Sequence, residues 1–202
     1  MPELIYVTDP MCSWCWGFAP VVEALESETG LPARLVMGGL AADSDAPMPE
    51  ETQRYVRSAW DAVERTTGAR FNHDFWTRCK PRRSTYPACR AVLAAAGQGP
   101  TAGRAMFEAI QRAYYLDARN PSDLSTLDAL AAGLVPPIDR EQFADDLRSS
   151  LIDQRLHADL DEARSLGASS FPTLLLLSDE LHVIASGWNS LPECRSRLQG
   201  LL

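Results

Sequence analysis

The chain has 202 residues, of which 46% are hydrophobic and 23% charged, a composition typical of a globular protein that can bury a core. A formal net charge of -8 and a pI near 4.9 argue against a surface that binds nucleic acid or an anionic membrane. No apolar run reaches membrane-spanning length, and no basic stretch of the signal-peptide kind opens the sequence. We therefore expect a cytoplasmic protein with no nucleic-acid or membrane partner, whose thiols are mostly reduced.

The first unit that the sequence predicts is β-α-β. The apolar run Leu4–Val7 predicts a buried strand over Glu3–Thr8, and apolar residues at i, i+3, i+4 and i+7 predict a helix over Trp16–Thr29. Residues Ala33–Met37 predict a second strand. A crossover through the helix makes the two strands parallel.

Cys12 and Cys15 form a C-x-x-C motif between this first strand and its helix. Unpaired amide N–H groups and the helix dipole favour a negative charge there, so we expect the pKa of Cys12 to lie below that of a free thiol. The thiolate of Cys12 is then the attacking group, and Cys15 is near enough to resolve a mixed disulfide.

Two other interpretations of the motif are weaker. Zinc needs four ligands, and the remaining cysteines and the scattered histidines offer no second pair, so we expect no metal. An inert structural disulfide is disfavoured because a C-x-x-C between a strand and a helix is the redox arrangement.

Helical patterns dominate from about Ala41 to Gly167. The predicted helices are Glu50–Thr67, Tyr86–Gly97, one carrying Ala105–Ala113, two with capped starts at Ser125 and Asp139, and one that carries Leu156–Leu166 and stops at Gly167. We interpret their apolar stripes, including that of Glu50–Thr67, as core.

The chain then returns to strands. Thr173–Leu177 and Leu181–Ala185 predict an antiparallel pair, and a capping box from Ser190 to Glu193 opens the last helix. The predicted order is β-α-β, an all-helical insert, then β-β-α, an α/β fold. We expect a sheet domain made of residues 1–40 and 168–202, with residues 41–167 as a helical insert domain.

These features resemble the thioredoxin fold interrupted once. The resemblance depends on the strand, the C-x-x-C and the helix, and on SFPT at residues 170–173 before a leucine-rich strand. The long insert resembles that of DsbA-like proteins, and DPMCSWCWG at residues 9–17 resembles their FrnE-like members. In that fold a cis-proline faces the two cysteines, and Pro172 matches it. The resemblance implies that the backbone before Pro172 pairs with an extended substrate in β fashion.

Several other residues are candidates for the site. Trp14 and Trp16 flank the reactive thiol, and with Phe171 we expect them to bind substrate through an apolar rim. Asp9, three residues before Cys12, has three candidate roles. Its carboxylate would oppose the helix dipole and raise the pKa of the thiol, or accept a proton during resolution of the mixed disulfide, or it is a turn residue, which we favour slightly.

A basic cluster surrounds two further cysteines: Arg78, Lys80, Arg82, Arg83 and Arg90. Such a cluster is commonly a solvated face. The sharper hypothesis is that Arg82 or Arg83 binds a substrate carboxylate such as that of glutathione. Whether Cys79 and Cys89 form a regulatory disulfide stays open, because spacing in sequence does not give distance.

We therefore predict a thiol–disulfide oxidoreductase that acts on protein or small-molecule thiols and disulfides. It needs no bound cofactor, and glutathione is the co-substrate that we consider. One alternative is a glutathione transferase of the kappa class or a hydroxychromene-carboxylate isomerase, although those relatives typically place a serine where Cys12 stands. Another is a redox-dependent binding or chaperone module without turnover.

Overall fold

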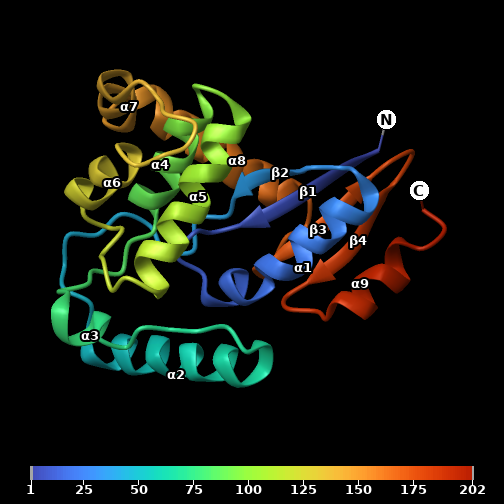
Figure 1. The fold of residues 1–202 in the computed structure, drawn as a ribbon, viewed down its shortest axis with the longest axis horizontal. Helices are drawn as coiled ribbons and strands as arrows, with labels where there is room; N and C mark the ends of the chain where they lie inside the picture. Colours follow the sequence, from blue (N-terminus) through green and yellow to red (C-terminus); the bar gives the residue numbers. More distant parts are fainter. Residues whose placement is uncertain (1, 202) are drawn as a thin grey trace.

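The computed structural model describes residues 2–201 and shows a mixed sheet with helices on both faces and beyond one end (Figure 1). The elements in chain order are β1 (Glu3–Thr8), α1 (Ser13–Thr29), β2 (Ala33–Met37), α2 (Glu50–Thr67), α3 (Phe75–Arg78), α4 (Tyr86–Ala96), α5 (Pro100–Tyr115), α6 (Leu124–Ala131), α7 (Arg140–Leu147), α8 (Ser150–Ser165), β3 (Thr173–Leu177), β4 (Leu181–Ser186) and α9 (Leu191–Leu198). Within the described chain, no helix is both long and apolar enough to cross a membrane.

The sheet has the strand order β2-β1-β3-β4. The central strand β1 pairs in parallel with β2 and antiparallel with β3, and β3 pairs antiparallel with β4. Because side chains alternate along a strand, Leu4 and Tyr6 pack into the main core, and Ile5 and Val7 pack on the other face, near Ala163 of α8. The α/β fold expected from the sequence is confirmed.

One continuous core joins the sheet to most of the helices that lie between β2 and β3. It includes residues of β1, α1 and β3 together with residues of α4 to α8. The segment 41–167 therefore contains all of α2 to α8, but it shares its main core with the sheet. The helices α4 to α7 gather beyond one end of the sheet (Figure 1).

The helices α2 and α3 are held by a second, aromatic core. Its centre is Trp60 of α2, which is fully buried and has its ring centroid 5.0 Å from that of Trp76 and 5.5 Å from that of Tyr115. In Figure 1 α2 and the short α3 lie together, apart from α4 to α8. Near its C-terminal end α2 also packs on α1, where Val63 and Thr67 lie against Gly17. The aromatic core and α1 together therefore attach α2.

The structure corrects two predicted helix starts and adds one short helix. The first helix begins at Ser13, not Trp16, because Cys12 itself occupies the N-cap position. The helix expected to be capped at Ser125 begins at Leu124 with Asp123 as its N-cap. The short α3 is not predicted, since four residues carry no periodicity. The predicted caps at Asp139 and Ser190 are confirmed.

Candidate active site

The two cysteines of the motif lie where β1 ends and α1 begins. The backbone turns there through a hydrogen bond from the Cys12 amide to the Asp9 carbonyl, at 3.0 Å. Both thiols are free and lie within hydrogen-bonding reach of each other. Cys12 keeps 6% of its surface exposed, whereas Cys15 is fully buried. Only Cys12 can therefore meet a substrate directly.

A second segment, far along the chain, completes the site. The Cys12 thiol donates to the Phe171 carbonyl with a sulfur–oxygen distance of 3.8 Å, and the peptide bond from Phe171 to Pro172 is cis. The cis-proline expected from the resemblance is confirmed. Gly38, just after β2, lies against the Phe171 ring so closely that a Cβ atom there would be 2.2 Å from it. The lack of a side chain at Gly38 therefore leaves the room that Phe171 occupies.

The Cys15 thiol and burial reverse the predicted direction of the pKa shift of Cys12. The neighbouring Cys15 thiol, burial and the Asp9 carboxylate raise the pKa of Cys12 well above its usual value, while the amide of Cys15 lowers it. The lowered pKa expected from the helix N-terminus is therefore wrong, because the amide of Cys15 does not offset the Cys15 thiol and the burial of Cys12. The first turn of α1 also has no cationic side chain.

Asp9 is a buried carboxylate that fastens the site to its surroundings. Its oxygens accept from the amides of Met11 at 2.8 Å and Leu40 at 2.7 Å, and from the Thr85 hydroxyl at 2.6 Å. The Cys89 thiol donates to it at 3.5 Å. Burial raises the pKa of Asp9, and these hydrogen bonds oppose that rise. The bond to Met11 is the turn role considered from sequence, and no hydrogen bond joins Asp9 to the resolving cysteine among residues 2–201.

A cavity of about 170 Å³ opens beside Cys12. The cavity is lined by the C-x-x-C segment, by the helices α2 and α5, and by three loops: the one after β2, the one before α4 and the one before β3. The lining residues are Met11, Cys12, Ser13, Trp14, Leu40, Met48, Tyr55, Val56, Ala59, Trp60, Arg82, Arg83, Ser84, Thr85, Tyr114 and Phe171. The lining is apolar toward α2 and polar toward residues 82–85. Such a cavity suits a ligand with an apolar body and a charged end.

The two tryptophans predicted to form a rim lie in different places. Trp14 lines the cavity. Trp16 is not among its lining residues; its indole N–H donates to the Arg70 carbonyl at 3.1 Å, and its ring stacks on Tyr115 with centroids 5.6 Å apart. The structure therefore brings Trp14 to the cavity and Trp16 to the aromatic core, and the predicted substrate contact of Trp16 has no support from the cavity.

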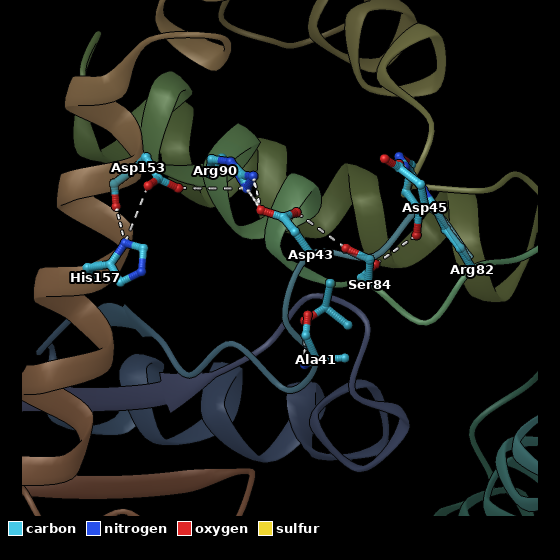
Figure 2. Close-up of polar contacts among 10 residues, drawn as sticks. Ala41, Asp43, Asp45, Arg82, Ser84, Arg90, Asp153 and His157 are labelled. Carbon is cyan, nitrogen blue, oxygen red and sulfur yellow. Dashed lines mark hydrogen bonds and ion pairs between the residues drawn. The ribbon is translucent and has the colours of Figure 1, made fainter. Parts of the chain in front are cut away.

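The arginines of the basic cluster differ in whether they pair with an acidic residue. Arg82 pairs with Asp45, and Arg90 pairs with Asp43 (Figure 2). Figure 2 also shows Asp153 of α8 on the far side of Arg90, at 3.9 Å. These pairs hold the loop after β2 against α4. Arg83 forms no ion pair in the described part of the chain and lines the cavity, so it is available to an anionic ligand.

The other cysteine pair has separate contacts. The Cys79 thiol donates to the Ala118 carbonyl at 3.2 Å, whereas Cys89 is fully buried against Asp9. Both thiols are free. The structure thus shows no bond between Cys79 and Cys89.

The sequence did not predict that α2 lines the cavity beside Cys12. The apolar stripe of α2 that we interpreted as core consists of Tyr55, Val56, Ala59, Trp60 and Val63. Trp60 and Val63 are fully buried, as expected, but every member except Val63 lines the cavity. An apolar stripe at helical spacing has the same pattern whether it faces a core or a cavity. No signal in a single sequence separates the two.

The fold and the paired cysteines define a thioredoxin-fold protein of the DsbA-like kind. The sequence model of the thioredoxin family named Thioredoxin_5 matches residues 5–194, and the chain therefore belongs to the thioredoxin family. The relatives found do not separate the FrnE-like branch, which stays a prediction.

Two solved structures are similar over nearly the whole chain. A protein from Nitrosomonas europaea, described as a candidate protein disulfide isomerase, is 32% identical with a TM-score of 0.86, over 98% of this chain and 95% of that one. The cytosolic disulfide reductase DsbM from Pseudomonas aeruginosa is 29% identical with a TM-score of 0.80, over 98% of each chain. These relatives support the thiol–disulfide oxidoreductase class in general.

The curated relatives have a different description. The ClpXP adapter protein SpxH of Bacillus subtilis is 25% identical over 181 residues, which cover 88% of this chain and 59% of that protein. The chain thus spans about three fifths of the length of the curated relatives it matches.

Proposed function

We propose that this chain is a thiol–disulfide reductase in which Cys12 attacks and Cys15 resolves. The observation that carries the proposal is the arrangement of the pair: Cys12 borders the cavity and faces the Phe171 carbonyl, with Cys15 buried behind it. The thiolate of Cys12 attacks a substrate disulfide and forms a mixed disulfide, with release of the first substrate thiol. Cys15 then attacks Cys12 and releases the second.

The reducing direction is supported by the raised pKa of Cys12. A C-x-x-C pair becomes a strong oxidant when its reduced form is stabilised, and a low pKa of the attacking thiol stabilises that form as a thiolate. Burial and the neighbours of Cys12 act in the opposite sense. The similarity to a protein described as a cytosolic disulfide reductase supports the same direction and a cytoplasmic location.

Glutathione, as the disulfide, is the small substrate that we propose. The related reductase has been solved with glutathione, at 28% identity to this chain and a TM-score of 0.78. Arg83 offers a guanidinium to a glutathione carboxylate from the polar side of the cavity. Arg83→Ala should raise KM for glutathione disulfide roughly tenfold with little change in kcat, since one charge-assisted hydrogen bond is lost. Lys80→Ala, which removes an exposed cation nearby, is the matched control.

The resolving role of Cys15 gives the main test. Cys15→Ala, incubated with glutathione disulfide, should gain one adduct at Cys12 that dithiothreitol releases, as measured by intact-mass spectrometry. Cys12→Ala should gain far less, because Cys15 is fully buried. Equal adduct formation by the two variants would refute the division of roles.

A second candidate function is that of an adapter, which the similarity to SpxH favours. An adapter binds a protein partner without turnover. A Cys12→Ser variant that keeps the biological activity of the protein in cells would support it, and loss of that activity would favour the reductase.

A further inference from the structure

The hydroxyl group of Tyr6 lies beneath the buried cysteine. Tyr6 is in the middle of β1, is 1% exposed, and donates to the Cys15 carbonyl at 3.4 Å. The Thr8 and Cys15 side chains are the nearest polar neighbours that influence this hydroxyl. Its ring is fixed by Phe18 and Phe107, with centroids 6.1 and 6.3 Å away. The hydroxyl is therefore held in place beside Cys15, with its hydrogen bond to the Cys15 carbonyl.

Among the described residues, no carboxylate is hydrogen-bonded to Cys15. The hydrogen bonds of Asp9 go to Met11, Leu40, Thr85 and Cys89. The titratable groups that face Cys15 are Cys12 at the start of α1, Tyr6 of β1 and Tyr115 of α5. Of the two tyrosines, only Tyr6 donates to Cys15, through the Cys15 carbonyl; the Tyr115 hydroxyl has no hydrogen-bond partner among residues 2–201.

We propose that Tyr6 is a positioning residue for the second step of the reaction, in which its neutral hydroxyl donates a hydrogen bond to the Cys15 sulfur as that sulfur becomes a thiolate. The inference rests on the proposed function and assigns the step in which Tyr6 acts. A charge that develops in a dry site is strongly stabilised by a donor that is already oriented. Burial raises the pKa of Tyr6 well above its usual value, so the hydroxyl keeps its proton and acts as a donor.

The second step balances without another reactant. The Cys15 S–H bond breaks, and its electron pair forms the bond between the sulfurs of Cys15 and Cys12. The bond between Cys12 and the substrate sulfur breaks, and its electron pair leaves with that sulfur, which ends as a thiol with the proton that Cys15 has lost. The cysteine pair loses two electrons and the substrate disulfide gains them. Tyr6 gives up no atom.

The test compares the two steps in Tyr6→Phe, which keeps the ring and removes only the hydroxyl. Reduced protein is mixed with excess glutathione disulfide and quenched with acid over time, and intact mass reports the mixed disulfide and the Cys12–Cys15 disulfide. The first step should keep its wild-type rate. The second should be roughly tenfold or more slower, as expected for loss of one hydrogen bond to a charged group. The pH at which the second step reaches half of its maximal rate should also rise.

Tyr115→Phe is the matched control, because it removes a buried hydroxyl near the same pair that has no hydrogen-bond partner. Its second step should match that of the wild type. Wild-type kinetics and pH profile in Tyr6→Phe would overturn the inference and leave the proposed function intact. Equal slowing of both steps would also overturn it, since that indicates a structural role only. A wild-type protein that never forms the Cys12 adduct would instead refute the proposed function.

Discussion

Thr85 donates its hydroxyl to the Asp9 carboxylate at 2.6 Å, and this buried hydrogen bond ties the start of α4 to the loop that carries Cys12. The same hydroxyl oxygen accepts from the Ala41 amide at 3.1 Å. One side chain thus joins the active-site loop, the loop after β2 and the insert.

Replacing Thr85 by Val should therefore destabilise the protein. The change keeps the side-chain shape but removes one of the donors to the buried Asp9 carboxylate and the acceptor of the Ala41 amide, which should lower the free energy of unfolding by about 1–3 kcal/mol. Denaturant unfolding measures the loss. Thr85→Ser keeps the hydroxyl and serves as the control; equal losses in the two variants would show that the methyl group, not the hydrogen bond, matters.

The raised pKa of Cys12 predicts how its reactivity depends on pH. Only the thiolate reacts with iodoacetamide, so the rate at Cys12 should still be rising at pH values above the usual thiol pKa of about 8.5. Cys15→Ala removes the largest cause of the shift and should move the half-maximal rate to lower pH. A plateau near pH 7 in the wild type would contradict this expectation and support an oxidant.

Gly38 should be sensitive to the addition of one methyl group. A Cβ there would lie 2.2 Å from the Phe171 ring, so Gly38→Ala must displace the residue whose carbonyl faces Cys12. We expect kcat/KM with glutathione disulfide to fall roughly tenfold while the variant stays folded, with a stability loss of about 1–3 kcal/mol. In Gly133→Ala the new Cβ makes an ordinary contact at 3.6 Å, so that variant should behave like the wild type. Unchanged activity in Gly38→Ala would mean that the Phe171 ring moves without consequence.

Asp159 gives the protein a pH-dependent stability. Burial raises the pKa of this carboxyl to about 6, above the unfolded value of about 3.9, so its stabilising contribution is complete below pH 4 and is lost as the pH rises through 6. Asp159→Asn keeps an oxygen for the Met37 amide, which now donates to Asp159 at 2.8 Å. The free energy of unfolding of the variant should be about 1 kcal/mol higher than that of the wild type at pH 7.5, after allowance for solvent screening. Near pH 4 the two values should match.

Denaturant unfolding at several pH values measures this difference. Asp161→Asn, which changes an exposed carboxylate on the same helix, should show little of it. A constant difference between Asp159→Asn and the wild type from pH 4 to pH 7.5 would contradict the assignment.

The helices, strands and motifs were predictable because they depend on residues close together in the sequence. Contacts between residues far apart in the sequence were not. The strands and most helices follow from apolar periodicity, and the places of Cys12 and Pro172 follow from their motifs. The predicted direction of the pKa shift of Cys12 was wrong because the contact with the Cys15 thiol and the extent of burial depend on packing. Arg82 and Arg83 looked alike, and only the fold gives Arg82 an acidic partner. From the sequence, Tyr6 was only one residue of an apolar strand, because its contact with Cys15 is known only from the fold.

The separate anchoring of α2 has a consequence for the size of the substrate. The cavity of about 170 Å³ has room for part of a small ligand but not for a protein loop. Because α2 lies at the edge of the fold and is held by the aromatic core around Trp60 and by one side of α1, we expect it to open while the sheet stays folded (Figure 1). Amide hydrogen exchange should then be faster in α2 than in β1 and β3. Such local opening would expose Cys12 to disulfides of folded proteins at a free-energy cost well below that of global unfolding.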